Sequence, residues 1–315
     1  MPEGDVIHAL ARTFDTLFVG RAVRVSSPQG RFAGGARLIN GRIVTSVRAH
    51  GKHFFMQLSA PGPVREGHPD GTQVAYTDDL WLHVHLGLYG SWRLYGSESV
   101  EVPVSIGAPR LAGDSGTTHE NGRWTPPEPV GQVRVRIETD DAVADLSGPN
   151  RCEVITPDEQ RQVQQRLGPD PLSPHALTRP DLERAFIDAI RSRSRTIGEL
   201  VMDQSVIAGV GNIYRAESLF ITGIHPRRRG NRVAEARLSL LWKTICPLMA
   251  HGLEVGRIET VSDEDAPEPP LEGDPEASRW YVYHRTGRPC LRCGTPVAED
   301  LMATRRLFWC PGCQR

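Results

Sequence analysis

Four cysteines near the end of the chain have the spacing of a metal site. Cys290 and Cys293 form one C-x2-C pair, and Cys310 and Cys313 form a second pair after sixteen intervening residues. Four thiolates in this pattern can close a tetrahedral Zn²⁺ site. Because protein atoms fill all four positions, the predicted zinc is structural and has no open position for catalysis.

The sixteen residues between the two pairs include an aromatic, arginine-bearing stretch, "ATRRLFWC", with Arg305 and Arg306 side by side. The zinc could simply hold a small fold together. A metal-pinned hairpin that displays arginines is also well suited to contact phosphate. The remaining cysteines, Cys152 and Cys246, lack such spacing and are expected to be ordinary buried thiols.

Two further stretches bear on chemistry. In "SVIAGVGN", Gly209 and Gly211 interrupt two helical patterns and predict a tight turn, which either packs helices together or presents backbone N–H groups to a phosphate. Pro2 stands just before apolar residues at roughly helical spacing, from Val6 to Leu17. Proline is common at helix starts, so composition alone predicts only a first helix there.

The elements that must position these residues change along the chain. Residues 20–149 contain short β-branched or aromatic stretches separated by Gly and Pro, which predict an antiparallel sandwich or barrel. The connections 61–79 and 105–129 are too long for hairpin turns and are expected to be mobile surface loops. Helical spacing predicts helices at 179–190, 196–204, 212–220 and 235–253. We therefore expect a sandwich domain at 1–149, a linker at 150–174, a helical domain at 175–277 and a zinc unit at 278–315.

Bulk properties narrow the class of protein. No apolar run is long enough to span a bilayer and no signal segment begins the chain, so a cytoplasmic protein without a membrane partner is predicted. The net charge of −1 conceals basic clusters at 191–195, 227–229 and 278–315. Arginine outnumbers lysine 35 to 2, which makes each lysine worth locating.

Taken together, the motifs resemble the formamidopyrimidine-DNA glycosylase/endonuclease VIII family. They are "PEG" at the amino end, "GK" at 51–52, "HLGLYG" at 85–90, "LGPDPL", "MDQSVIAGVGNIYRAESLF" and the four-cysteine tail. The resemblance covers essentially the whole chain. It implies a multidomain α+β fold: an N-terminal antiparallel β-sandwich with a leading helix, a helix–two-turn–helix domain and a C-terminal four-cysteine zinc finger.

The resemblance also implies a role for the first residues. Once Met1 is removed, Pro2 is a secondary amine that can attack C1′ of a deoxyribose and form a cationic Schiff base. A free α-amino group has a pKa near 8, so a useful fraction is unprotonated at neutral pH. By the same resemblance, Glu3 is the general acid/base that helps to open the sugar ring.

Other site residues follow by matching motifs. Lys52 occupies the place of the family lysine that holds the lesion phosphate or sugar and assists β-elimination. Asn212 matches the asparagine that grips backbone phosphate, and Arg305 matches the zinc-finger arginine implicated in δ-elimination. The register of "TRR" leaves Arg306 as a weaker candidate.

The branch of the family depends on how the space of an extruded base is filled. By resemblance, Leu88 and Tyr89 occupy the wedge position, that is, the side chains that fill the space left by the extruded base. The "LYG" motif resembles endonuclease VIII, although either side chain could be buried strand core. An arginine–phenylalanine–glycine wedge is missing from "DLSGPNRCEV", and Gly198 stands where formamidopyrimidine-type enzymes have a lysine. These departures favour oxidised pyrimidines, while "GDV" after "PE" leaves the lesion preference open.

The leading hypothesis is a bifunctional DNA glycosylase/AP lyase of base excision repair. We expect it to bind one structural zinc ion, to need no organic cofactor, and to have damaged DNA as its partner. It is further expected to be a monomer in the cytoplasm, associated with the nucleoid. Alternatives are an oxidised-purine (8-oxoguanine/formamidopyrimidine) glycosylase, a non-catalytic binder of damaged DNA, and a zinc-stabilised adaptor without a DNA role. Steep salt dependence of binding would distinguish the adaptor from the others.

Overall fold

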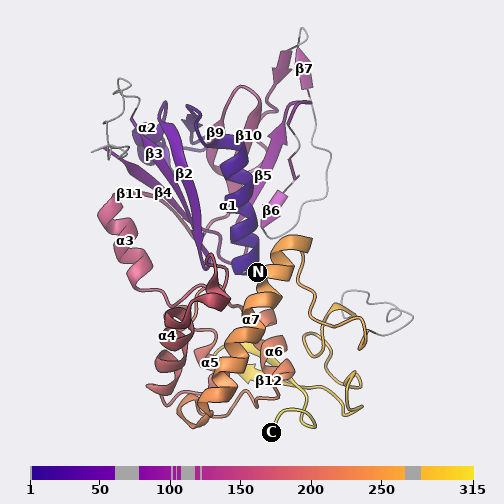
Figure 1. The fold of residues 1–315 in the computed structure, drawn as a ribbon. Coiled ribbons are helices and arrows are strands. Elements are labelled where there is room, and N and C mark those ends of the chain that lie inside the picture. Colours follow the sequence, from indigo (N-terminus) through magenta and orange to yellow (C-terminus); the bar gives the residue numbers. More distant parts are fainter. Residues whose placement is uncertain are drawn as a thin grey trace. The chain divides into compact units, whose positions relative to one another are not determined.

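The computed structural model describes residues 2–60, 78–100, 102–103, 105–107, 118–120, 123–266 and 278–315. The chain divides into two compact units, which are described separately. The first comprises Met1–Pro2 and Val6–Gln164, and the second comprises Glu3–Asp5 and Gln165–Arg315 (Figure 1). Within the described ranges, no helix has both the length and the apolar character needed to cross a bilayer.

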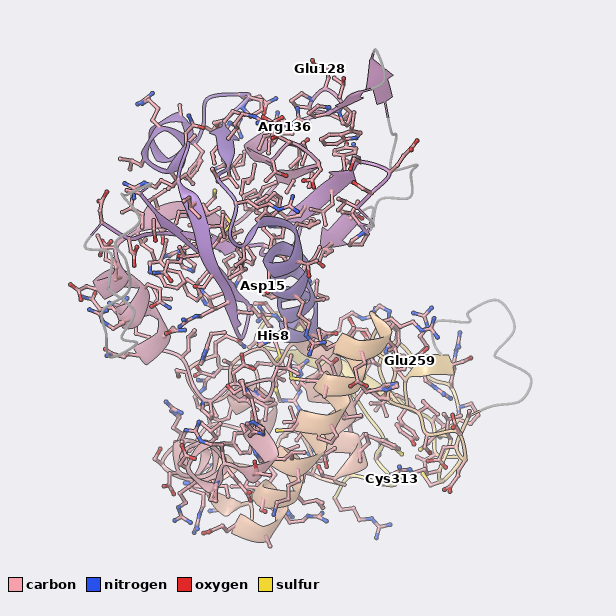
Figure 2. All side chains as sticks on the ribbon, turned by 45° about the horizontal axis from the view of Figure 1, so that its top comes forward. His8, Asp15, Glu128, Arg136, Glu259 and Cys313 are labelled. Carbon is pink, nitrogen blue, oxygen red and sulfur yellow. The ribbon has the colours of Figure 1, made fainter. Side chains whose placement is uncertain are left out.

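The first helix, α1 (Gly4–Phe18), begins two residues after Pro2, so Pro2 does not start it. Its buried face consists of side chains at helical spacing: Ile7, Leu10, Phe14 and Leu17. The predicted face began at Val6, but that side chain is only half-buried and its neighbour Ile7 takes the place in the core. His8 and Asp15, labelled in Figure 2, lie outside this buried face, so the helix is amphipathic.

Two antiparallel sheets form the first unit, as predicted. One has the order β11-β4-β3-β2. The other has the order β1-β9-β10-β5-β6. The strands are β1 (Arg24–Ser26), β2 (Ile43–His50), β3 (His53–Ser59), β4 (Leu80–His85), β5 (Ser91–Gly96), β6 (Ser105–Gly107), β9 (Val133–Glu138), β10 (Ala142–Ser147) and β11 (Arg151–Ile155).

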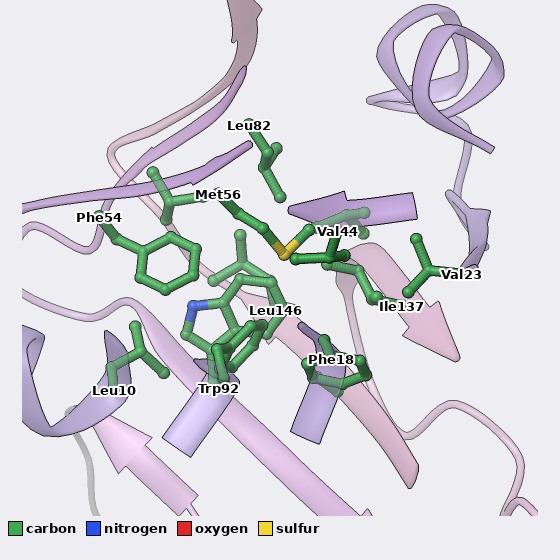
Figure 3. Close-up of a cluster of buried hydrophobic side chains, with 14 of the residues drawn as sticks. Leu10, Phe18, Val23, Val44, Phe54, Met56, Leu82, Trp92, Ile137 and Leu146 are labelled. Carbon is green, nitrogen blue, oxygen red and sulfur yellow. The ribbon is translucent and has the colours of Figure 1, made fainter. Parts of the chain in front are cut away.

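The core of this unit draws side chains from both sheets and from α1 (Figure 3). The ring of Phe14 lies 5.0 Å from that of Phe54 on β3 and 4.7 Å from that of Trp92 on β5. Both contacts are edge-on, the arrangement that aromatic quadrupoles favour. The helix therefore joins the two sheets through a shared aromatic cluster.

Several elements of this unit were not predicted. Helix α2 (Ala33–Ile39) lies between β1 and β2, and the expected linker 150–174 contains β11 and helix α3 (Pro157–Gln165). Within the expected loop 105–129, the chain forms β6 and the small pair β7 (Thr118–Glu120) and β8 (Arg123–Thr125). Strands of three residues give too short an alternation to be recognised in a sequence. Most of the expected loop 61–79 lies outside the described residues.

The second unit is helical, as predicted. It contains α4 (Pro180–Arg191), α5 (Ile197–Leu200), α6 (Asn212–Ile221) and α7 (Glu235–Val255), with short 3₁₀ turns at Ala176–Thr178 and Gly230–Arg232. Helix α5 is only four residues long, shorter than the predicted 196–204. Its start is fixed by a capping box in which Thr196 and Glu199 satisfy each other's backbone N–H groups.

The tail of the chain forms a hairpin of β12 (Ala298–Met302) and β13 (Arg305–Trp309). Its side chains join those of α6 in one apolar cluster, in which the ring of Phe220 lies 4.9 Å from that of Tyr281. The hairpin is therefore packed on the helix that starts at the glycine turn. Sandwich, helical region and cysteine-bearing hairpin together confirm the predicted fold class.

Candidate active site

Pro2 lies at a small cavity of the first unit. The cavity, about 20 Å³ in volume, is lined by Pro2, Ile7, Lys52, His85, Leu86 and Gly87. Lys52 stands in the two-residue turn between β2 and β3, and only 8% of its surface is exposed. The structure thus brings together two predicted site residues, Pro2 and Lys52, and adds His85, which sequence reasoning did not single out.

The hydrogen bonds of His85 determine what it offers to this cavity. The N–H of Gly87 donates to Nδ1 of His85 over 3.2 Å. Burial, with the nearby Lys52 charge as the next cause, lowers the pKa of His85 to about 4. His85 is therefore neutral at physiological pH, and since Nδ1 accepts a hydrogen bond, its proton is assigned to Nε2. The side chain is a neutral hydrogen-bond donor.

Glu3 is anchored in the second unit, at the start of α6. Its Oε2 accepts from the N–H of Gly211 over 2.7 Å, and its Oε1 accepts from the N–H of Ile213 over 2.8 Å. A carboxylate at a helix N-terminus is stabilised by the helix dipole and by the unpaired N–H groups of the first turn. The glycine turn that could have received a phosphate thus holds the chain's own carboxylate.

Glycine is required at this turn because backbone and side chain approach closely. A Cβ on Gly211 would lie 2.4 to 2.7 Å from atoms of the Glu3 side chain, closer than real Cβ contacts. The N–H of Gly4 donates to the carbonyl of Gly209, which has a φ of +92°. Two glycines therefore allow residues 3 and 4 to lie directly against the turn.

Asn212, the first residue of α6, is engaged within the protein. Its Nδ2 donates to the carbonyl of Arg306 over 3.0 Å, and its Oδ1 accepts from Arg215. Arg215 is buried and also donates to the Arg306 carbonyl over 2.7 Å. Burial, and secondarily the charge of Arg305, lowers the pKa of Arg215 to about 10. The Arg306 carbonyl, which accepts from both Asn212 and Arg215, therefore joins the start of α6 to the arginine-bearing hairpin.

The two hairpin arginines differ in their surroundings. Arg306 donates to both carboxylate oxygens of Glu299 over 2.5 and 2.7 Å, and its guanidinium lies 4.9 Å from the ring of Phe308. These hydrogen bonds hold the pKa of Glu299 at about 2. Arg305 is exposed at the start of β13. Its charge is not part of the Glu299 pair, which makes it the better placed of the two for an anionic ligand.

The predicted wedge residues lie in the connection between β4 and β5. Leu88 is 54% exposed and Tyr89 is 76% exposed. An exposed leucine beside an exposed tyrosine on one short turn cannot be strand core, so that alternative is excluded for both. The structure presents both side chains to solvent.

The four cysteines of the tail converge, as predicted. Their sulfur atoms all lie within 4.8 Å of one another, and Cys313 is labelled in Figure 2. The Cys290 and Cys313 sulfurs are 3.8 Å apart, and those of Cys293 and Cys310 are 3.4 Å apart. With Zn–S bonds of about 2.3 Å, a tetrahedral site has sulfur–sulfur edges of roughly 3.8 Å. The donor set and spacing therefore fit a four-thiolate metal site.

The other two cysteines lie outside this cluster. Cys152 is half-buried on β11 and Cys246 is buried on α7. Burial raises the pKa of each thiol to about 12. Both thiols are therefore protonated at physiological pH, which is the ordinary buried state expected from the sequence.

Sequence reasoning missed a hydrogen-bonded group of polar residues in the first unit: His53, the fully buried His83, and Glu153, whose side chain is 39% exposed. It also missed Glu217 on α6, a fully buried carboxylate that accepts from three successive N–H groups at 281–283. A signal for His83 alone was available in "LHVHLG", where it alternates with His85 on one strand face. No local pattern marks Glu217.

Two family models match the chain. The formamidopyrimidine-DNA glycosylase N-terminal domain matches residues 1–152, and the formamidopyrimidine-DNA glycosylase H2TH domain matches residues 167–264. The chain is 39% identical over 314 residues to endonuclease 8 1 of Mycobacterium tuberculosis and 28% identical over 320 residues to endonuclease 8 of Escherichia coli, with both chains fully covered in each case.

Solved structures share the fold. A MutM complex with DNA containing carbocyclic 8-oxo-G superposes with a TM-score of 0.68 at 19% identity, over the full length of both chains. A complex of Lactococcus lactis Fpg with DNA containing an abasic site superposes with a TM-score of 0.67 at 18% identity, over 99% of each chain. At this identity the likeness concerns the fold alone.

Proposed function

The chain belongs to the formamidopyrimidine-DNA glycosylase/endonuclease 8 family of DNA glycosylase/AP lyases, and from this premise we propose that it excises oxidised pyrimidines through a Schiff base on Pro2. Strand cleavage by β,δ-elimination follows on the same covalent intermediate. The observation that carries the proposal is the cavity at which Pro2 lies beside Lys52 and His85.

The first chemical step forms a bond between the Pro2 nitrogen and C1′ of the damaged nucleotide, once Met1 has been removed. The glycosidic C–N bond breaks, and the departing base takes up a proton from water. Opening of the sugar at O4′ gives an iminium that stays cationic, because the iminium of a secondary amine carries no N–H that it could lose. The covalent route divides one difficult displacement into easier steps.

Glu3 follows Pro2 directly in the chain, so we propose that its carboxylate acts on the same sugar that Pro2 attacks. Two backbone N–H donors favour its ionised form. Glu3 thus starts as a base, takes up a proton and returns it to the ring oxygen as C1′–O4′ opens. The iminium then acts as an electron sink: a proton leaves C2′, the 3′-phosphate departs, and a second elimination releases the 5′-phosphate.

Phosphate contacts belong to the basic residues of the two units. Lys52 is proposed to hold the phosphate or sugar of the lesion and to assist β-elimination. Arg305 and Asn212 are proposed to grip the backbone, and Arg306 to contribute less because Glu299 already holds its guanidinium. Contacts of this kind fix the position of DNA on the protein without reading sequence.

Preference for oxidised pyrimidines rests on the wedge. Leu88 and Tyr89 are exposed, whereas the connection between β10 and β11 is confined to 148–150 and lacks an arginine–phenylalanine–glycine tripeptide. The relatives with the higher identities are named endonuclease 8. Excision of oxidised purines is the second candidate, because the wedge position alone does not define the base pocket.

The cysteine cluster is proposed to bind one structural Zn²⁺. All four ligand positions are protein sulfur atoms, so the ion would supply folding energy and no catalytic water. We also propose that the protein acts as a monomer on DNA in the cytoplasm, which light scattering of the purified protein, alone and bound to DNA, and its localisation in cells would check.

The deciding experiment is borohydride trapping on duplexes that carry thymine glycol, 8-oxoguanine or an abasic site. Borohydride reduces the iminium to a stable amine, which links protein and DNA. We expect a covalent band with thymine glycol and the abasic site, and none with Pro2→Gly or with an N-terminally extended protein. Trapping with 8-oxoguanine instead would favour the purine alternative. No trapping at the abasic site would leave a non-catalytic DNA binder.

A further inference from the structure

The proposed mechanism leaves three polar side chains on one face of the sheet β11-β4-β3-β2 without a role. Strand register places Glu153 of β11 and Phe55 of β3 opposite His83 of β4. His53 precedes Phe55 by two residues and therefore points to the same face. His83 is 0% exposed. A polar group buried this deeply is costly unless it is hydrogen-bonded, so its partners are informative.

His83 and its two partners form a series of hydrogen bonds in which every donor points toward Glu153. The Glu153 carboxylate accepts from Nδ1–H of His83, over 2.9 Å between Oε1 and Nδ1. Neutral His83 then carries a lone pair on Nε2, which accepts from Nδ1–H of His53 over 2.8 Å. The carboxylate at one end thus sets the tautomer of both histidines, because it can only accept.

Surrounding groups keep these histidines neutral. Burial lowers the pKa of His83, Glu153 opposes that effect, and Arg151 adds to it. Burial also lowers the pKa of His53, to about 3, with smaller contributions from His83, His85, His50 and Arg151. Arg151 itself pairs with Glu153 over 3.0 Å. The hydrogen-bonded arrangement is therefore stable throughout the physiological pH range.

His53, at the other end of this hydrogen-bonded series, lies next to residues of the Pro2 cavity. His53 directly follows Lys52, which lines the cavity, and its ring centroid lies 5.0 Å from that of His85, which lines it too. The rings of His53 and His83 are inclined by only 19° with centroids 5.1 Å apart, as expected for two rings joined edge to edge by the hydrogen bond between them. Fixing the His53 ring therefore fixes the backbone beside Lys52 and one side of the His85 ring.

We propose that Glu153, His83 and His53 form a positioning chain that holds Lys52 and His85 in place at Pro2. None of the three touches the reacting atoms. The inference rests on the proposed function, because the positioning chain is proposed to support Schiff-base chemistry at this cavity. Displacement of a reacting group by about 1 Å can cost on the order of a hundredfold in rate, so such support has a measurable consequence.

The test compares His83→Phe with the wild-type protein on a duplex with an abasic site. A phenyl ring can keep the stack on Phe55, whose ring lies 4.7 Å from that of His83, but makes neither hydrogen bond. We expect the saturating single-turnover rate of borohydride trapping to fall by about 10- to 100-fold. Affinity for DNA with an uncleavable abasic analogue, measured by fluorescence anisotropy, should change far less than this rate.

Two other substitutions make the test specific. Glu153→Ala removes the carboxylate that ends the positioning chain. Because this side chain is 39% exposed, the variant should lower the rate without a folding defect. Glu153→Gln should restore most of the rate, because its amide oxygen can accept from His83. Gln57→Leu is the matched control. It removes the hydrogen bonds that Gln57 accepts from Ser46 and donates to Asp79, both outside the positioning chain, and should leave the rate unchanged.

The outcomes separate the two proposals. If the wild-type protein does not trap at all, the proposed function fails. If it traps and His83→Phe and Glu153→Ala react at the wild-type rate, only the positioning chain is overturned. A lower melting temperature in His83→Phe and Gln57→Leu alike, with both rates unchanged, would assign His83 to stability alone.

Discussion

At the scale of single residues, the proposed chemistry relies on two features: a carboxylate held by backbone N–H groups, and histidines kept neutral by burial. The N–H groups of Gly211 and Ile213 hold Glu3 at the start of α6. His85 and His53 lie in the sheet behind Lys52, with pKa values of about 4 and 3. Both features can be tested by single substitutions.

Gly211→Ala should disable the chemistry without unfolding the protein. Its φ of −123° is accessible to alanine, so the backbone is not strained. The added Cβ would instead meet the Glu3 side chain at 2.4 to 2.7 Å and displace the carboxylate from its donors. We expect the trapping rate to fall at least about tenfold. Gly34→Ala, which meets nothing within 4 Å, is the matched control and should react normally.

Buried neutral histidines should make stability depend on pH. The folded-state pKa values of His53 and His85 lie below 6.5, so between about pH 6.5 and pH 4 the unfolded chain binds more protons than the folded one. The contribution of these two histidines to stability is therefore fully present above pH 6.5 and is lost as the solution is acidified. Urea midpoints at pH 7, 6 and 5 should decrease, and less so in His53→Asn. Equal slopes in both proteins would contradict this.

At the scale of elements, α6 connects the glycine turn to the hairpin. Its first residue, Asn212, binds the Arg306 carbonyl, and Glu217 on the same helix accepts from the N–H groups at 281–283 and from Thr260. Burial raises the pKa of Glu217, and these donors oppose that shift. One helix therefore positions the turn and the segment leading to the hairpin.

Glu217→Ala should destabilise the second unit strongly. It would leave three buried N–H groups without an acceptor, each costing about 1 to 3 kcal/mol. We expect a loss of about 3 kcal/mol or more in urea unfolding, with Glu217→Gln losing less because its amide oxygen remains an acceptor. Glu254→Ala, at an exposed position of α7, serves as control and should unfold like the wild type.

The hairpin arginines should contribute unequally to DNA binding. Arg305→Ala should reduce the slope of log affinity against log salt concentration by about one, as for loss of one phosphate contact. Arg306→Ala should reduce it less, because Glu299 already pairs with that charge. Anisotropy titrations from low to physiological salt would measure both slopes. A larger effect at Arg306 would reverse the assignment.

At the scale of the whole molecule, the proposed zinc ion is expected to stabilise the tail but not the sandwich. Hydrophobic side chains of 281–310 form one cluster with Ala216 and Phe220 of α6, whereas the sandwich core draws only on residues of the first unit. Loss of the ion should therefore disturb the hairpin and α6 before the sandwich.

Metal removal should separate these parts experimentally. We expect elemental analysis to find one zinc per chain. A strong chelator, or Cys290→Ser, should abolish DNA binding and raise amide hydrogen exchange in 278–315 and α6, while β3, β4 and β10 keep their protection. Unchanged exchange in the tail after metal loss would show that the hairpin folds without it.

The sequence by itself determined the parts of the protein that local chemistry encodes. The C-x2-C pairs require only spacing to define a thiolate site, and the apolar periodicity of 235–253 defines a helix because helical geometry repeats within four residues. The family motifs located Pro2, Glu3 and Lys52. The tail cluster and the long helices were accordingly found where the sequence predicts them.

Only the tertiary structure decided which distant residues meet. Gly211 donates to Glu3 across 208 positions of sequence, and His83 joins Glu153 across 70. Such pairs leave no periodic trace, because long-range packing and strand register create them. For the same reason the three-residue strands β6, β7 and β8, which depend on pairing rather than propensity, appeared in the sequence as part of a loop.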